Sequence, residues 1–257
     1  MGVTGVIENE LEVAGASYRP ARTTMAADWL TLVDRYLESM AAIEKGLGEA
    51  SQGRQRLGLD IRKSAIFGAN SLGLLATALL RLRGVEVVTM GESRAPVLSP
   101  HRICGLQGWR HVSMSPTLRH LQLVEELDAH YECFLETTLE AASARVGPFD
   151  TILMATGGPF SPLKALDGLG EHGVLVDLTR ANMIDLLSIE TSPCIVLKST
   201  VTFGSPSDRK YFQWAVKDLS TIELQYPGWL FGLASLPKGD QIRKALLNDS
   251  EDQLSRW

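Results

Sequence analysis

Residues 63–90 of the chain read KSAIFGANSLGLLATALLRLRGVEVVTM. A short apolar run is followed by a turn with Gly68 and Gly73, an apolar segment of helical length and a second apolar run. We interpret this order as strand, turn, buried helix and strand, the βαβ unit of nucleotide-binding folds. In that unit the glycines permit a sharp turn and close helix packing, and the helix N-terminus offers unpaired N–H groups to a pyrophosphate.

Asn70 stands in this turn where the nucleotide-binding motif has its middle glycine. Glycine is used there because its missing side chain lets the backbone approach the phosphates. With asparagine, three outcomes are open: the nucleotide is displaced, Asn70 contacts it, or affinity is lost.

Short apolar runs and amphipathic segments continue to alternate along the chain, which is typical of a parallel sheet covered by helices. We expect strands at Ser64–Gly68, Val85–Met90, Ala129–Cys133, Thr151–Ala155, Gly173–Asp177 and Cys194–Val201, and helices at Leu72–Leu82, Leu121–Leu127, Leu135–Val146 and Phe212–Leu219. The predicted fold class is α/β, a Rossmann doubly wound parallel sheet of six strands with helices on both faces and an N-terminal helical arm.

The expected organisation has three parts: an arm and helix at 1–62, the Rossmann domain at 63–222 and a C-terminal tail at 223–257. Met1–Arg22 shows no sustained period, so we expect an irregular arm there.

A helix is predicted from Thr24, because apolar residues recur at three- and four-residue spacing as far as Ile43. Gly46 and Gly48 are expected to end it. The polar, arginine-rich segment Ser51–Lys63 reads as a solvated connection.

The composition is that of a globular protein, with 257 residues, 45% hydrophobic and 21% charged. A formal net charge of −5 gives no general attraction to nucleic acid. We find no apolar run long enough to cross a membrane and no signal peptide at the start, so a cytoplasmic protein is expected. The cysteines, Cys104, Cys133 and Cys194, are odd in number and widely spaced, which favours reduced thiols.

The segment Gly91–Ser115 is long for a connection in an α/β domain and leaves the carboxyl end of the second strand. It is interpreted either as a lid or substrate loop or as an insertion with a local core. His101, Cys104 and His111 lie in it and could bind a metal, but no fourth ligand is evident, and packing or hydrogen bonding is the favoured alternative.

The cofactor preference of a dinucleotide enzyme is set just after the second strand, where this chain has Gly91, Glu92, Ser93 and Arg94. Glu92 favours a free ribose hydroxyl. Gly91, Ser93 and Arg94 favour a 2′-phosphate, so we expect a slight preference for NADP(H) over NAD(H).

Other polar and aromatic candidates have structural alternatives. Asp177 ends a central strand and is either a site residue or a hydrogen-bonded structural acid. For His130, a packed histidine is favoured over an acid or base. His172 is placed in a turn without a role, and Tyr226 and Trp229 are interpreted as anchors of the tail rather than stacking groups.

Five segments in the same order resemble the cofactor domain and tail of medium-chain dehydrogenases, closest to the glucose dehydrogenase branch. The resemblance extends over Lys63–Leu247 and is carried by GANSLGLLATALL at 68–80, LVEELDAHY at 123–131, residues 147–178, residues 203–220 and YPGWLFGL at 226–233.

This resemblance implies a role for each matching residue in dinucleotide binding. The pyrophosphate would be held by Gly68, Ser71, Leu72 and Gly73 around Asn70, the adenosine ribose by Ser93 and Arg94, and the nicotinamide by Ala155, Thr156, Gly157, Leu178 and Thr179.

The departures from the family concern its zinc-binding catalytic domain. Met1–Arg62 has no Cys or His, so the zinc ligand set is not matched and we expect a truncated relative without zinc. Catalytic groups would then come from Asp177, His101 and His111, or from a partner chain.

Three functions remain open at this point. The first is a zinc-independent NAD(P)(H)-dependent oxidoreductase acting on a small carbonyl or alcohol. The second is a repurposed non-redox biosynthetic enzyme of the cyclase or isomerase type, which the missing zinc set and Asn70 favour. The third is a non-catalytic binding or regulatory subunit.

Loss of the family's catalytic domain would uncover the apolar side of Thr24–Ile43 and the residues around Trp229–Leu233. Either the N-terminal helix folds back or two chains pair, and we expect a homodimer.

Overall fold

The structure is a computed structural model. It describes residues 6–7, 10–13, 16–18, 26–91, 116–134, 136–156, 165–179, 195–199, 201 and 205–235.

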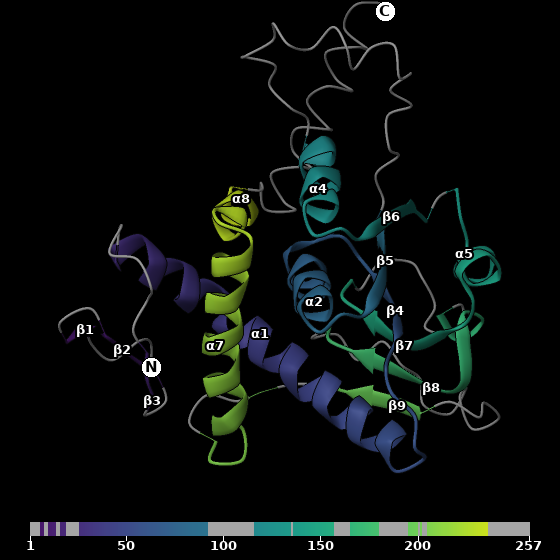
Figure 1. Ribbon diagram of the computed structural model, residues 1–257, viewed down its shortest axis with the longest axis horizontal. Helices are drawn as coiled ribbons and strands as arrows, with labels where there is room; N and C mark the ends of the chain where they lie inside the picture. Colours follow the sequence, from purple (N-terminus) through teal and green to yellow (C-terminus); the bar gives the residue numbers. More distant parts are fainter. Residues whose placement is uncertain are drawn as a thin grey trace, which may run out of the picture.

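A parallel sheet of six strands forms the centre of the molecule, in the order β6-β5-β4-β7-β8-β9 (Figure 1). The strands are β4 (Lys63–Phe67), β5 (Glu86–Gly91), β6 (His130–Cys133), β7 (Phe149–Met154), β8 (Leu169–Asp177) and β9 (Ile195–Lys198). The chain runs outward from β4 to β6, returns to β7 and continues outward on the other side, which is the doubly wound topology. The predicted α/β fold and its six strands are confirmed.

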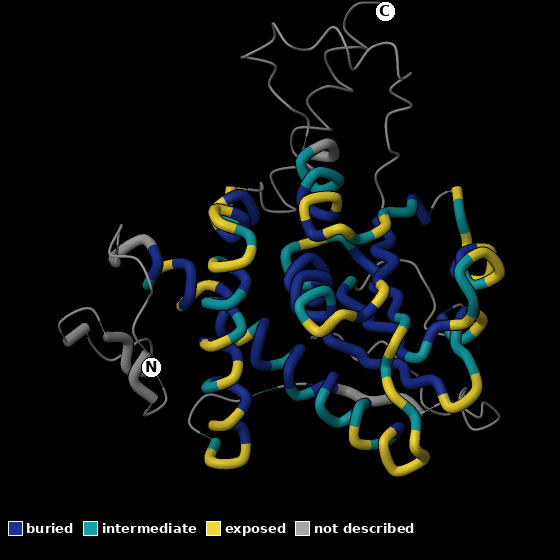
Figure 2. Tube along the Cα trace, viewed as in Figure 1, coloured by how far each residue is buried: buried dark blue, intermediate teal, exposed yellow. Residues whose placement is uncertain are grey.

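Both faces of the sheet are covered because the buried strand residues alternate between two apolar clusters. Ile66, Leu153 and Val176 belong to the larger cluster, whereas Phe67 and Ile152 belong to the smaller one. The larger cluster is completed by α1 (Ala26–Gln55), α2 (Ser71–Leu82), α4 (Pro116–Glu125), α7 (Arg209–Gln225) and α8 (Trp229–Ala234), and the smaller by α5 (Leu139–Val146). Figure 2 shows this core as buried segments on the sheet and on the inner sides of the helices.

The helix α1 does not end at its glycines, contrary to the prediction, but continues through both to Gln55. Gly46 lies against the sheet so closely that an added Cβ would stand 2.6 Å from Val176 Cγ1 and 3.0 Å from Ser199 Cβ. A glycine inside a helix costs about 1 kcal/mol relative to alanine. Here it allows α1 to approach β8 instead of stopping the helix.

The apolar side of α1 is covered by the chain itself. Trp29, Val33 and Met40 are buried in the larger cluster, and α1 packs on α7, β8 and β9. Trp229 is also buried, and its indole N–H donates to the carbonyl of Leu123 over 2.9 Å, as expected of an anchor. Of the two expected ways to cover these faces, the structure shows the N-terminal helix folded back onto the domain, whereas the homodimer stays a prediction.

The N-terminal arm contains short strands, which corrects the prediction of an irregular segment. Strands β1 (Val6–Ile7), β2 (Glu10–Val13) and β3 (Ala16–Tyr18) form an antiparallel sheet in the order β1-β2-β3. Strands of two to four residues are too short for a period to show in the sequence.

The polar connection after α1 is tied into the fold by Arg54, which is only 4% exposed. Its guanidinium donates to Asp150 Oδ1 at 2.5 Å and to the carbonyl oxygens of Asp60 and His172. The other carboxylate oxygen of Asp150 accepts from the backbone N–H groups that open β4, at 2.8 and 2.9 Å. The connection is therefore not merely solvated.

His172 lies within β8, not in a turn before it, with a positive φ of 58°. The pairing of β7 with β8 shifts register between Phe149 and Thr151 at this point. At this irregularity the His172 carbonyl accepts from Arg54, and β8 begins four residues before the apolar run that starts at Gly173.

We predict that Arg54→Met lowers the free energy of unfolding by about 2 kcal/mol or more, because it leaves Asp150 Oδ1 and two carbonyl oxygens without their guanidinium donor. Urea denaturation measures the loss. Arg56→Met is the matched control, since Arg56 is exposed on the same segment. Equal denaturation midpoints for the two variants would contradict the role assigned to Arg54.

Candidate functional site

A cavity of about 390 Å³ opens where the strand order reverses, at the carboxyl ends of β4, β7 and β8. Ligands in doubly wound sheets bind in this crevice. Its walls include six residues of the predicted cofactor site, Asn70, Leu72, Ala155, Thr156, Leu178 and Thr179, together with Glu38, Ser39, Ala42, Ser199 and Val201.

The turn between β4 and α2 has the two features that the glycine pattern predicts. Gly68 has a φ of 113°, a conformation that side chains other than glycine rarely adopt. At Gly73, an added Cβ would stand 1.7 Å from the carbonyl oxygen of Gly68. No other residue fits there without moving α2 away from the sheet.

Asn70 is the N-cap of α2 and uses both ends of its side-chain amide within the protein. Its Oδ1 accepts from the backbone N–H of Gly73 at 3.0 Å, and its Nδ2 donates to the carbonyl of Ala155 at 2.7 Å. The asparagine thus caps the helix and fastens it to the end of β7. The N–H groups of Ser71 and Leu72, at the first two positions of the helix, have no intrahelical acceptor and remain suited to an anion.

Asp177 is buried at the end of β8, with 2% of its surface exposed. Its Oδ1 accepts from the backbone N–H of Thr179 at 2.8 Å and from the Thr179 hydroxyl at 2.7 Å. Leu178 and Thr179 line the cavity, and Asp177 does not. This geometry agrees with the structural alternative for Asp177, a buried acid that shapes the segment facing the cavity.

Sequence reasoning missed the contribution of α1 to this site. Glu38, Ser39 and Ala42 form one wall of the cavity, and Glu38 is the one ionisable residue among the described residues that line it. The hydroxyl of Ser199, just after β9, donates to the carbonyl of Ala42 at 2.5 Å and ties this wall to the sheet. The signal in the sequence is the spacing of Ser39, Ala42 and Gly46, small residues on one side of the helix.

The space beside Gly91, at the end of β5, is already filled. An added Cβ there would stand 2.3 Å from the Tyr131 hydroxyl and 2.9 Å from the Cβ of Ala69. Our sequence argument that Gly91 leaves space for a 2′-phosphate is therefore not supported.

His130 is not packed, contrary to expectation, because 64% of its side chain is exposed. It lies on the edge strand β6, where its Nε2 is 2.9 Å from Glu132 Oε1. Arg145 donates to the same oxygen at 2.6 Å. This cluster is on the outermost strand and away from the cavity.

Several predicted residues lie outside the described part of the chain: His101, His111, Ser93, Arg94, Gly157, and the cysteines Cys104 and Cys194. Among the described residues, no three His, Cys, Asp or Glu side chains gather in a metal-binding arrangement. Cys133 is buried and is not part of a disulfide. A search of the same residues for a helix of the length and apolarity needed to cross a membrane finds none.

The strand order, the glycine turn and the cavity together define a Rossmann-type α/β domain with the cleft of a dinucleotide-binding fold. No protein-family model matches the sequence.

Curated relatives are glucose dehydrogenases. A glucose 1-dehydrogenase of Methanocella arvoryzae is 26% identical over 240 residues, which is 91% of this chain and 61% of the relative. Glucose 1-dehydrogenase 2 of Vulcanisaeta moutnovskia is 27% identical over 199 residues, 75% of this chain and 49% of the relative. The chain thus spans about half to 61% of the length of these relatives.

Solved structures of dehydrogenases share the fold. Glucose dehydrogenase from Haloferax mediterranei, in complex with NADP, Zn and gluconolactone, matches with a TM-score of 0.57 and 20% identity over 84% of this chain and 54% of that chain. An alcohol dehydrogenase from Thermotoga maritima matches with a TM-score of 0.52 and 17% identity over 77% and 48%. These structures show the shared fold, and the curated relatives show a similarity of the sequence to glucose dehydrogenases.

We predict that Asn70→Asp lowers the free energy of unfolding by about 2 kcal/mol, because a carboxylate oxygen would replace the amide that donates to Ala155. Ser71→Asp is the control, since an acid in the first turn of a helix is favourable. It should leave the stability unchanged or slightly raised. Thermal and urea unfolding compare the two, and a stable Asn70→Asp variant would contradict the dual role of Asn70.

Proposed function

We propose that this chain binds NADP(H) or NAD(H) in the cavity at the carboxyl ends of β4, β7 and β8 and acts as an oxidoreductase on a small carbonyl or alcohol. The observation that carries the proposal is the convergence there of six residues that the sequence assigns to a dinucleotide. They come from three separate points of the chain, at 70–72, 155–156 and 178–179, so their meeting in one cavity is a property of the fold.

The residues present fit such a cofactor. The Gly68–Gly73 turn is a cradle in which an added Cβ would collide with backbone, and it leaves the N–H groups of Ser71 and Leu72 for the pyrophosphate. Thr156 and Thr179 would lie beside the nicotinamide, and Tyr131 would limit the space at the ribose. When bound, the cofactor supplies or accepts a hydride.

Glu38 is the residue that we propose for proton transfer to or from the substrate oxygen. It reaches the cavity from α1 and needs no second domain to be placed there. A general acid or base must lie within hydrogen-bond reach of the reacting group, and a carboxyl group can serve as either. Ser39, its neighbour in the same wall, would help to orient the substrate.

The substrate class is proposed from the relatives' names. Because both curated relatives described above are named glucose 1-dehydrogenase, aldoses are the first substrates to screen, followed by simple aldehydes and ketones. We propose a reaction without zinc, since Met1–Arg62 has no Cys or His for a ligand set.

A second function is favoured by one observation. The side chain of Asn70 lines the cavity and hydrogen-bonds two backbone groups. This structural role does not depend on a bound dinucleotide. A non-redox cyclase or isomerase would use the same cavity for its substrate alone. Failure to bind any dinucleotide would favour this alternative or the binding subunit.

Calorimetric titration with NADPH, NADP, NADH and NAD tests the proposal directly. We expect binding to the unaltered protein and at least about tenfold weaker binding to Ser71→Asp, because the added carboxylate repels a pyrophosphate at the helix N-terminus. Ala141→Asp is the control, an exposed position in the first turn of α5 on the opposite face of the sheet. Equal affinities for the two variants would place the nucleotide elsewhere.

Once a substrate is found, Glu38→Gln should lower kcat by about a hundredfold and leave dinucleotide affinity within about twofold, because only the proton transfer is lost. Steady-state kinetics at saturating dinucleotide measure the change. Glu49→Gln, on the same helix and outside the cavity lining, should retain full activity. If Glu38→Gln keeps the turnover of the unaltered protein, another group carries the proton.

A further inference from the structure

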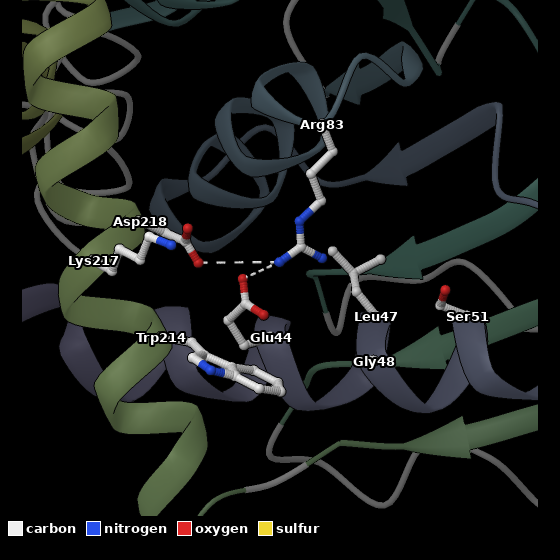
Figure 3. Close-up of a pocket in the computed structure, with 8 residues that line it drawn as sticks. All are labelled: Glu44, Leu47, Gly48, Ser51, Arg83, Trp214, Lys217 and Asp218. Carbon is white, nitrogen blue, oxygen red and sulfur yellow. Dashed lines mark hydrogen bonds and ion pairs between the residues drawn. The ribbon is translucent and has the colours of Figure 1, made fainter.

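The helix α1 lines two different cavities with consecutive parts of its length. Residues 38–42 face the candidate dinucleotide cavity. Residues 44–51 face a second cavity of about 340 Å³, which α7 and the end of α2 complete (Figure 3). Both cavities therefore share α1 as a wall.

Three helices meet in the second cavity at one group of charged side chains. Glu44 of α1 is 2% exposed, Arg83 follows α2 as its C-cap, and Asp218 belongs to α7. Arg83 Nη2 donates to Glu44 Oε1 and lies 4.0 Å from Asp218 Oδ2. Figure 3 shows the guanidinium reaching between the two carboxyl groups, with Trp214 beside them. We call these three residues the junction.

Asp218 is the acid of the junction whose ionisation is opposed by its surroundings. Burial, followed by the hydrogen bond and the charge of Glu44, raises the pKa of Asp218 to about 8, although Arg83 and Lys217 act in the opposite direction. Two carboxyl groups this close, with one guanidinium between them, cannot both ionise without repulsion. Deprotonation would add one negative charge to a partly buried contact between α1 and α7.

The other charged groups around α7 do not offset that charge. Lys45 of α1 pairs with Asp208, before the first turn of α7, at 3.1 Å. Arg81 of α2 pairs with Asp128 at 2.7 Å, and α8 has no ionisable side chain. Arg83 and Lys217 are the cations that face Asp218 in the described part of the chain.

We propose that the junction is a positioning group for the α1 wall of the dinucleotide cavity, so that dinucleotide affinity falls when the junction loses its proton. This inference rests on the proposed function. Glu38 and Glu44 are six residues apart on one helix, so a shift of α1 away from α7 moves Glu38, Ser39 and Ala42 with it. Such a shift would also strain the hydrogen bond from Ser199 to the carbonyl of Ala42.

The test is the affinity for NADH, followed by its fluorescence from about pH 7 to about pH 9, in the unaltered protein and in Asp218→Asn. NADH is the probe because it has no 2′-phosphate to titrate. We expect affinity to fall about fivefold in the unaltered protein and to stay constant in Asp218→Asn, which mimics the protonated acid. Glu49→Gln, which removes an acid of α1 outside both cavities, should follow the unaltered protein. Asp218→Ser, which also removes the titrating carboxyl group, should be insensitive to pH as well and is the second variant if Asp218→Asn does not fold.

Amide hydrogen exchange of residues 38–51, corrected for the intrinsic effect of pH, gives a second readout that does not need the nucleotide. Protection should fall above about pH 8 in the unaltered protein only. If protection falls above about pH 8 but NADH does not bind at any pH, the proposed function is rejected, whereas the junction still positions α1. Unchanged protection, or an affinity that falls equally in Asp218→Asn, would overturn the inference.

Discussion

The contact between Gly73 and the carbonyl oxygen of Gly68 is the constraint on which the site depends. With a Cβ only 1.7 Å from that oxygen, any side chain at position 73 would push α2 off β4. Because the contact holds, the helix begins directly above the carboxyl end of the central strand, where its N-terminus faces the crevice. The same closeness brings Asn70 within reach of both Gly73 and Ala155, so the end of β7 is fixed relative to the turn.

The helix α1 makes a second close contact of the same kind. Through this contact the N-terminal helix packs into the main domain. Gly46 lets the helix lie against Val176, and the buried ion pair of Arg54 with Asp150 holds its end at the start of β7. The helix is thereby part of the same apolar cluster as α2 and α7, not an appended arm. A wall of the cavity and its one described ionisable residue, Glu38, follow from this packing.

The alternation of apolar runs sufficed to predict the sheet and its six strands, because buried parallel strands need continuous apolar sequence. It did not reveal the role of Gly46, since a glycine that ends a helix and a glycine that permits close packing look alike until the partner strand is known. His172 and Arg54 were misread for a similar reason, as their roles depend on contacts about a hundred residues away in sequence. In the candidate site, the glycine turn and the segments after β7 and β8 could be predicted from the sequence. The contributions of Glu38 and Ser199 could not, because they depend on how α1 packs on the sheet.

Asn70 shows why the loss of a motif residue does not by itself mean the loss of a site. The middle glycine of such a turn serves one purpose, close approach of the backbone to phosphate. Asparagine at position 70 prevents this close approach. Its amide oxygen accepts from the N–H of Gly73, and the N–H groups of Ser71 and Leu72 remain without an intrahelical acceptor at the helix N-terminus. In the proposed function the phosphates would therefore approach the first turn of α2 rather than the turn before it. In that function, a side chain that both caps a helix and holds the neighbouring strand end would preorganise the cavity, and this would offset the closer contact that it prevents.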